Sequence, residues 1–228
     1  MTIIQFTVLI AVPVWECAAK GDDRPLLAGV HFEFADASHI RATCSDGYAL
    51  ASVTYEAQEP LAEFEPVDVP AEAFRRIRPV PSKFDEDGEP EFVSRSVDVT
   101  LDLDAGRAFI CDGDDATGVY ADFIRHKTSK YPDWRDLLRK CSGAWQGAPV
   151  NTLGFDPTLV AQATKAIGYD RLARVRLPSK PDASLLLYGD KPDHFAIVMP
   201  MFIDHENGTK RIASVIALGE PAAAPASA

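Results

Sequence analysis

The chain has 228 residues, of which 46% are hydrophobic, and this is enough for one large or two small domains with a buried core. A net charge of −11 argues against a simple nucleic-acid binder unless the 23 basic residues gather on one restricted face. The four cysteines form no CxxC pair and are predicted to be reduced, mostly buried thiols: Cys17, Cys44, Cys111 and Cys141.

The apolar N-terminal run, residues 1–14, is predicted to be a buried strand. It has no basic lead-in, and Pro13 and Glu16 cut it short of the roughly 20 residues that a membrane span requires. Nothing else in the sequence approaches a span, so we expect a soluble, cytoplasmic protein without membrane contact.

Runs of β-branched and aromatic residues recur along the chain, and Gly, Asp and Pro clusters separate them. Their lengths are typical of strands and predict a high sheet content, at residues 3–10, 26–34, 40–43, 49–55, 97–103, 108–111, 118–124, 174–177, 184–188, 195–203 and 212–218.

Three short helices are predicted between the strands. The first covers residues 14–20, and the second covers 71–78 behind Pro70, with Phe74 and Ile77 facing inward. The third begins with Asp156 as N-cap and Pro157 at the first helical position, and it ends at Gly168. Its apolar face consists of Leu159, Val160, Ala163 and Ile167.

These elements repeat as one strand, one short helix and about three strands, at roughly 1–57, 62–125 and 147–203. Such units predict an α+β fold with helices on one face of antiparallel sheets. Residues 80–95 and 139–149 are predicted to be surface loops, and 222–228 a disordered Pro/Ala tail.

Three segments of the chain stand out: RPLLAGVHFEFADASHIRATCSDGYALA at 24–51, YPDWRDLL at 131–138, and residues 154–201 with GFDPTLVAQATKAIG and FAIVMPM. In this order they resemble the bacterial DNA polymerase III β subunit (β sliding clamp) family. The resemblance covers about 24–138 and 150–203. It implies a DNA-clamp fold with one full domain at 1–138, resembling the family's middle domain, and a partial domain at 147–218, resembling the C-terminal half of the last domain with an added strand. Residues 219–228 are expected to follow as a disordered tail.

The resemblance also implies a pocket that binds clamp-binding peptides of polymerase or repair proteins. Leu and Met would supply an adaptable apolar surface, Gly47 would let a peptide backbone come close, and Arg24 could bind a carbonyl or carboxylate. Ala49 and Asp136 fall where the family often has basic residues. The implied pocket comprises Arg24, Leu27, Ser45, Gly47, Leu50, Pro132, Leu137, Ser184, Val198, Met199, Pro200 and Met201.

In the family, helices line a channel around duplex DNA, and the matching positive charges here would be Arg75, Arg76, Arg78 and Lys165. Basic helices in an acidic chain suit weak phosphate contact that allows sliding.

The first hypothesis is a non-enzymatic, cofactor-free processivity clamp that encircles double-stranded DNA as a homo-oligomer. The alternative is a clamp-fold adaptor or competitor that does not encircle DNA, and a small hydrolase on another α+β fold is the third possibility.

The run Asp112, Asp114 and Asp115 lacks a Glu at calcium-loop spacing and is predicted to be a hairpin turn. The five histidines are scattered singly.

The last expectation concerns the C-terminal region. Asn207-Gly208 lies between two apolar runs and predicts a hairpin, with residues 211–218 folding back on 195–203 as an added strand. Two chains could also join their half-units into a composite domain, and four chains would then complete a ring of six domains.

Overall fold

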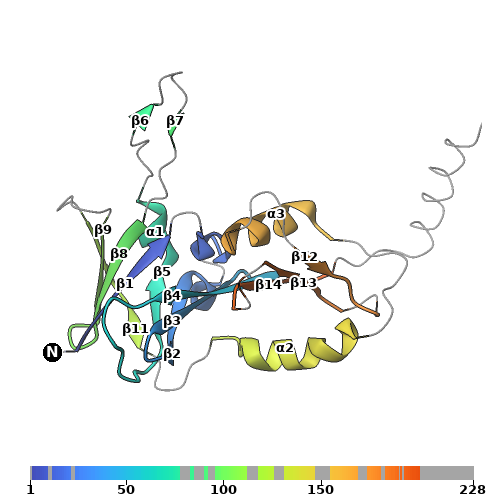
Figure 1. Cartoon of the computed structure of the whole chain (residues 1–228), viewed down its shortest axis with the longest axis horizontal. Helices are drawn as coiled ribbons and strands as arrows, with labels where there is room; N and C mark the ends of the chain where they lie inside the picture. The colour runs from blue at the N-terminus through green and yellow to red at the C-terminus, as the bar shows by residue number, and fades with distance from the viewer. Residues whose placement is uncertain are drawn as a thin grey trace, which may run out of the picture.

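Figure 1 shows the fold in a computed structural model of the whole chain. The residues that the structure describes are 2–9, 12–21, 24–77, 83–84, 90–91, 96–111, 118–125, 131–146, 155–168, 174–180, 183–189, 191 and 193–200.

Each of the first two units contains a strand, a short helical turn and at least three further strands, as predicted. The first unit consists of β1 (Ile3–Leu9), η1 (Val14–Cys17), η2 (Pro25–Leu27), β2 (Gly29–Asp36), β3 (His39–Ser45) and β4 (Ala49–Glu56). The second consists of β5 (Val67–Pro70), α1 (Ala71–Arg75), the short pair β6 (Lys83–Phe84) and β7 (Pro90–Glu91), β8 (Ser96–Asp102), β9 (Arg107–Cys111), β10 (Val119–Asp122) and β11 (Ile124–Arg125).

The two units exchange their first strands. β1 pairs antiparallel with β8 and completes the sheet β1-β8-β9-β10, whereas β5 pairs with β2 on the edge of β2-β3-β4. Neither unit can therefore satisfy its backbone hydrogen bonds without the other.

The third unit extends the second of these sheets. It contains α3 (Pro157–Ala166), β12 (Arg174–Arg176), β13 (Leu185–Tyr188) and β14 (Phe195–Val198). Because β14 pairs with β4, one eight-stranded sheet runs in the order β11-β5-β2-β3-β4-β14-β13-β12. The antiparallel α+β architecture predicted from the sequence is confirmed, while the domain boundaries near 138 and 147 stay a prediction.

The eight-stranded sheet has different covers on its two faces. One face, here called inner, packs against η1, α1 and α3, and the outer face carries α2 (Trp134–Ser142), which is followed by η3 (Gly143–Trp145) (Figure 1). Strand alternation sends the side chains of Ala49, Ala51 and Val53 to the inner core and that of Leu50 outward.

The inner core contains aromatic contacts within the first unit and between the first and second units. The Phe6 and Phe32 ring centroids are 5.1 Å apart, and Phe74 from α1 lies 6.0 Å from Phe32 and 5.3 Å from Trp15. Burial raises the pKa of the Cys17 and Cys44 thiols, which are free and fully enclosed. The predicted character of these two cysteines is confirmed.

The apolar N-terminal run forms β1, in which Ile4, Phe6 and Val8 are buried. Among the described residues, no helix is long and apolar enough to cross a membrane. The third predicted helix is also confirmed, because the Asp156 carboxylate accepts a hydrogen bond from the Thr158 backbone N–H at 2.8 Å and Pro157 begins the helix.

Several expectations were wrong in detail. The predicted helix 14–20 is a single 3₁₀ turn, and the predicted strand 26–34 begins only at Gly29, because Pro25 starts another such turn. The first strand of the second unit, β5, was implied by the repeat but was not among the predicted strand ranges. The predicted loop 139–149 begins inside α2, whose first turn is capped by the Asp133 side chain.

The added strand 211–218 and the tail 219–228 lie outside the described residues. The edge that this strand was expected to cover does not exist at residues 195–198. There, β14 is hydrogen-bonded to β13 on one side and to β4 on the other, so no open edge remains for another strand.

Candidate peptide-binding site

The turn between β3 and β4 is shaped by three consecutive residues of the first matched segment. The Asp46 carboxylate accepts hydrogen bonds from the Tyr48 and Ala49 N–H groups, both at 2.8 Å. The Ser45 hydroxyl donates to the Ala49 carbonyl at 2.8 Å and accepts from the Gly47 N–H at 3.0 Å. Gly47 has a φ of 91°, which favours glycine. The turn holds Tyr48 outward, 54% exposed.

Arg24 lies across this turn. Its Nη1 donates to the Asp46 carbonyl at 2.5 Å, its Nη2 donates to the Tyr48 hydroxyl at 3.2 Å, and its guanidinium lies 4.7 Å from the Tyr48 ring centroid. A Cβ at Gly47 would overlap the Arg24 guanidinium and would lie 3.6 Å from Leu27 Cδ1. Glycine is therefore required here both by the backbone and by the space that Arg24 occupies.

Met199 brings the third unit to the same place. Its N–H donates to the Tyr48 carbonyl at 2.8 Å, and its Sδ accepts from the Ser184 hydroxyl at 3.3 Å. The Met199 side chain is 42% exposed. Arg24, Tyr48 and Met199 together form what we call the turn patch, an exposed surface where residues of the first and third units meet.

Leu50 has a different environment from the turn patch. It is only 3% exposed and belongs to an outer-face cluster with Trp145, Phe195 and Ile197, against which Leu137 and other apolar residues of α2 pack. The apolar wall expected to receive a partner peptide is thus already covered by α2 and Trp145 of this chain.

Val198 does not belong to this site. It is fully buried in the inner core, and it pairs with Ala49, whereas Ile197 pairs with Leu50 on the outer face. Alternation along β14 separates the two side chains, so Ile197 takes the place that the sequence assigned to Val198. Pro132 is exposed, Pro200 is partly exposed, and Met201 lies outside the described residues.

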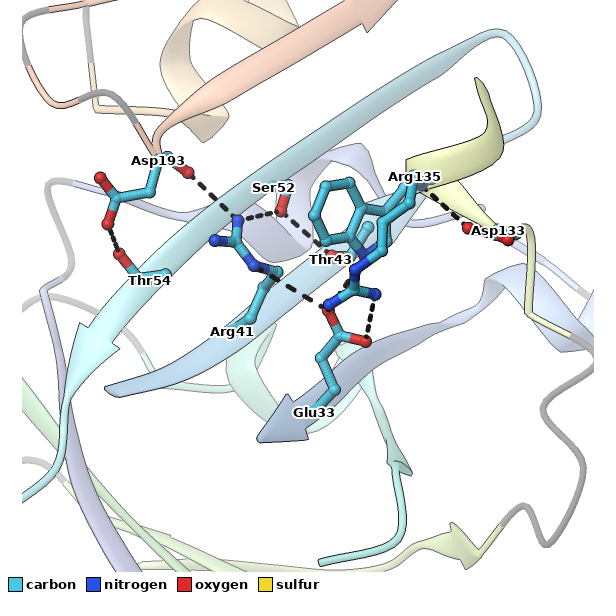
Figure 2. Close-up of polar contacts among 9 residues, drawn as sticks. Glu33, Arg41, Thr43, Ser52, Thr54, Asp133, Arg135 and Asp193 are labelled. Carbon is cyan, nitrogen blue, oxygen red and sulfur yellow. Dashed lines mark hydrogen bonds and ion pairs between the residues drawn. The ribbon is translucent and has the colours of Figure 1, made fainter. Parts of the chain in front are cut away.

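Polar contacts secure α2 to the outer face (Figure 2). Glu33 on β2 accepts hydrogen bonds from the Trp134 indole N–H and from Arg135 Nη1, both at 3.0 Å. Arg41 on β3 donates from Nη1 to the Ser52 hydroxyl at 3.1 Å and to the Asp193 carbonyl at 3.4 Å. Burial lowers the pKa of the Arg41 guanidinium. The Glu33 carboxylate, whose Oε1 lies 3.9 Å from Arg41 Nε, acts in the opposite direction and raises it.

Tyr131 fixes the segment that precedes α2. Its ring stacks on His31 with centroids 4.5 Å apart, and its hydroxyl donates to the Thr43 carbonyl at 3.3 Å. His31 Nδ1 in turn lies 2.5 Å from Asp68 Oδ1. This histidine is a buried residue with polar and aromatic contacts.

The predicted DNA-facing residues differ in their surroundings. Arg75 is partly buried and donates from Nη2 to the Trp15 and Ala18 carbonyls, both at 3.0 Å, so it ties α1 to η1. Arg76 is exposed. The Lys165 side chain is 63% exposed, with its Nζ 3.9 Å from Glu16 Oε1, and Arg78 lies outside the described residues.

No metal site is evident in the described part of the chain, where no three His, Cys, Asp or Glu side chains lie close enough together to bind an ion. Asp112, Asp114 and Asp115 lie outside that part.

The sequence missed Tyr48, Ile197 and Trp134 as site residues. Tyr48 follows directly after the matched turn glycine. The strand pairing that places Ile197 opposite Leu50 would have indicated Ile197 as a site residue. For Trp134, the available signal was the spacing of Trp134, Leu137, Leu138 and Cys141, which is that of one apolar helix face. No helix is predicted from the sequence at these positions, although their spacing is helical.

No protein-family model matches the chain. No curated protein matches it either. Among solved structures, it is similar to the DNA polymerase sliding clamp from Bacillus subtilis, with a TM-score of 0.56, 13% identity and coverage of 89% of this chain and 64% of the clamp.

It is also similar to the DNA polymerase III subunit beta from Pseudomonas aeruginosa, with a TM-score of 0.53 and 16% identity. The match covers 87% of this chain and 66% of that protein. A third similar structure is a Bartonella birtlesii sliding clamp bound to griselimycin. Its TM-score is 0.53 and its identity 14%, and the match covers 88% of this chain and 66% of that clamp. The chain thus spans 64–66% of the length of these clamps. The clamp fold predicted from the sequence is confirmed.

Proposed function

We propose that this protein is a non-enzymatic, clamp-like tethering factor that binds peptide segments of DNA polymerase or repair proteins. The observation that carries the proposal is the turn patch. Two units that are distant in sequence meet there within the clamp fold, and they leave a cation, an aromatic ring and a thioether exposed side by side.

The chemistry of the turn patch suits a partly apolar peptide. The Met199 side chain can adapt to varied apolar groups, and the Tyr48 ring offers a flat apolar surface with a polar tip. Arg24 can donate to a peptide carbonyl or carboxylate. Since Leu50 is covered by α2, we expect a peptide to bind mainly through the turn patch. A peptide could contact Leu50 only if α2 moved away from the sheet.

The first form of this function is a homo-oligomeric ring around double-stranded DNA, with Arg76 and Lys165 on the inner-face helices close to phosphates. Exposed cations on helices of an acidic protein would give weak, sequence-independent contact.

A second form, an adaptor that does not encircle DNA, is favoured by one observation. Arg75 is committed to two backbone carbonyls, and Lys165 lies beside Glu16, so two of the three predicted DNA-facing cations that the structure describes are engaged by the protein itself. An adaptor would compete for clamp-binding peptides and would not need a DNA channel.

The peptide site is tested by fluorescence anisotropy with a labelled clamp-binding peptide from a bacterial DNA polymerase III. We expect Tyr48→Ala combined with Met199→Ala to weaken binding at least tenfold, since both side chains are exposed at the patch. Tyr120→Ala on β10 is the matched control, because Tyr120 is also exposed. Equal affinity of the wild type and the double variant would rule out the patch.

The two forms are separated by oligomeric state and by retention on circular DNA. A ring predicts a defined oligomer that stays on closed circular DNA and leaves when the circle is cut, and Arg76→Glu with Lys165→Glu should reduce this retention. Arg139→Glu with Lys140→Glu, on the exposed side of α2, is the control. A monomer that binds peptide but is not retained would establish the adaptor.

A further inference from the structure

A groove with a volume of about 860 Å³ lies between α2, η3 and the outer face of the sheet. Trp134 and Leu138 of α2 line it together with Trp145 of η3. Volumes of this size and walls of this composition are usual for ligand sites. The groove shares no residue with the turn patch and lies toward the other end of β14, beside Phe195.

The floor of the groove is apolar because of strand register. Tyr188 pairs with Phe195 and Leu186 pairs with Ile197, so alternation places these four side chains on the outer face. A bulky apolar side chain inserted between α2 and these strands would lose its contact with water without displacing a charged group.

Positive charge predominates at the polar part of the groove. Arg41 and Arg135 share one carboxylate, Glu33, with Arg41 Nε at 3.9 Å and Arg135 Nη2 at 3.0 Å. Arg176 adds a third guanidinium, whose Nε donates to the Trp145 carbonyl at 2.6 Å.

Two of these cations, Arg41 and Arg176, line the groove together with one carboxylate, Asp193, which accepts a hydrogen bond from Thr54, whereas Arg135 and Glu33 are not among the lining residues. The local excess of positive charge occurs in a protein with a net charge of −11. Burial lowers the pKa of Arg41, while the nearby Glu33 and Asp193 carboxylates act in the opposite direction, as a further anion in the groove would.

The aromatic residues are not arranged as a platform for nucleic-acid bases. The Trp134 ring already has the Arg41 and Arg135 guanidiniums at 4.8 and 4.2 Å from its centroid. Trp145 is 8% exposed, and its indole N–H donates to the Ser184 carbonyl at 2.8 Å. Base stacking needs open ring faces, whereas an inserted side chain needs only an apolar wall.

We propose that this groove binds an extended segment of a protein partner in which an aromatic side chain stands next to an acidic one. The aromatic side chain lies against Leu186, Tyr188 and Phe195, and the carboxylate is bound by Arg176 and Arg41. The groove is thus a second interaction site, independent of the turn patch and of any role in tethering to DNA.

The test uses the synthetic peptide acetyl-Gly-Asp-Phe-Asp-Gly-amide and the ¹⁵N-labelled full chain. We expect saturable shifts of the Trp134 and Trp145 indole N–H signals, and at least tenfold weaker binding when both acidic residues of the peptide are replaced by lysine. Arg176→Glu should weaken binding at least tenfold and Arg176→Gln less. Arg139→Glu, the same charge change on the exposed side of α2, should leave the affinity unchanged.

Three outcomes would overturn the proposal. The two indole signals could stay in place at millimolar peptide, or the lysine peptide could bind as well as the acidic one. A short oligothymidylate could also move the same two signals at lower concentration than the peptide, which would assign the groove to single-stranded nucleic acid. The spectrum of each variant without ligand reports whether it is folded, and Tyr48→Ala with Met199→Ala should leave this binding intact.

Discussion

Leu50 on β4 lies directly opposite Ile197 on β14, and both side chains are enclosed beneath α2 and Trp145. This pair joins the first unit to the third on the outer face, while Ala49 and Val198 join them on the inner face. The predicted site residue Leu50 is therefore a structural residue in the resting chain.

Leu50→Ala should lower the free energy of unfolding by about 2–4 kcal/mol, because it leaves a cavity in a covered cluster. Urea denaturation followed by tryptophan fluorescence measures this loss. Met199→Ala is the matched control and should cost less than about 1 kcal/mol, because its side chain is 42% exposed. Similar small losses for both variants would contradict the burial of Leu50.

Arg75→Met should destabilise the protein by about 1–3 kcal/mol, since the carbonyls of Trp15 and Ala18 would lose their donor. The melting temperature should fall, whereas Arg76→Met, at the exposed C-cap that directly follows α1, should leave it nearly unchanged. A larger fall in melting temperature for Arg76→Met than for Arg75→Met would show that Arg75 is not the arginine that stabilises the fold.

Gly47→Ala should destabilise the turn by about 1–2 kcal/mol, because its φ of 91° strains any other residue. The new Cβ should also displace Arg24 from Tyr48, so the affinity for the clamp-binding peptide should fall even where the protein remains folded. Thermal melting and anisotropy measure the two effects. Gly106→Ala, at another positive-φ turn with open space around it, separates backbone strain from the loss of the Arg24 contact.

Stability should fall because of His194 as the pH is lowered from about 7, through the ordinary histidine pKa of 6.5, toward the lower pKa of the folded protein. Burial lowers the pKa of His194 below its ordinary value of 6.5, so the unfolded chain takes up a proton before the folded protein does. The stability contribution is complete above that ordinary value and is lost as the pH falls toward the folded pKa.

Unfolding free energies at both ends of this range, for the wild type and His194→Gln, test the assignment. The variant should show a flatter profile. The neighbouring Asp193 does not affect stability in this pH range. The Thr54 hydroxyl lowers the pKa of Asp193 below 3.8, so its contribution to stability is lost only in stronger acid. A variant as sensitive to acid as the wild type would exclude His194 as the cause.

The strands could be predicted well from the sequence because alternation is a local property. Ile4, Phe6 and Val8 alternate with polar or exposed residues, and the run forms β1 as expected. The same rule, applied to register, would have selected Ile197 over Val198. The pairing of β1 with β8 could not be predicted, since no local pattern in either strand identifies a partner in the other unit.

The candidate site was predicted only in part. The Ser45-Asp46-Gly47 turn, Arg24 and Met199 do come together, because turn chemistry is encoded in adjacent residues. The covering of Leu50 by α2 could not be foreseen, since it depends on where a short helix packs after the chain has left the second unit. The capping contact at Asp133 and the apolar spacing after it were the available signals.

The exchange of first strands also constrains how the protein can be synthesised. Thr7 on β1 hydrogen-bonds to Asp98 on β8, and 91 positions separate them. At about 5–20 residues per second, a ribosome needs roughly 5–18 seconds to add that length. During this interval β1 emerges without its partner strand, and the nascent chain must be kept from pairing with other chains until β8 has left the exit tunnel.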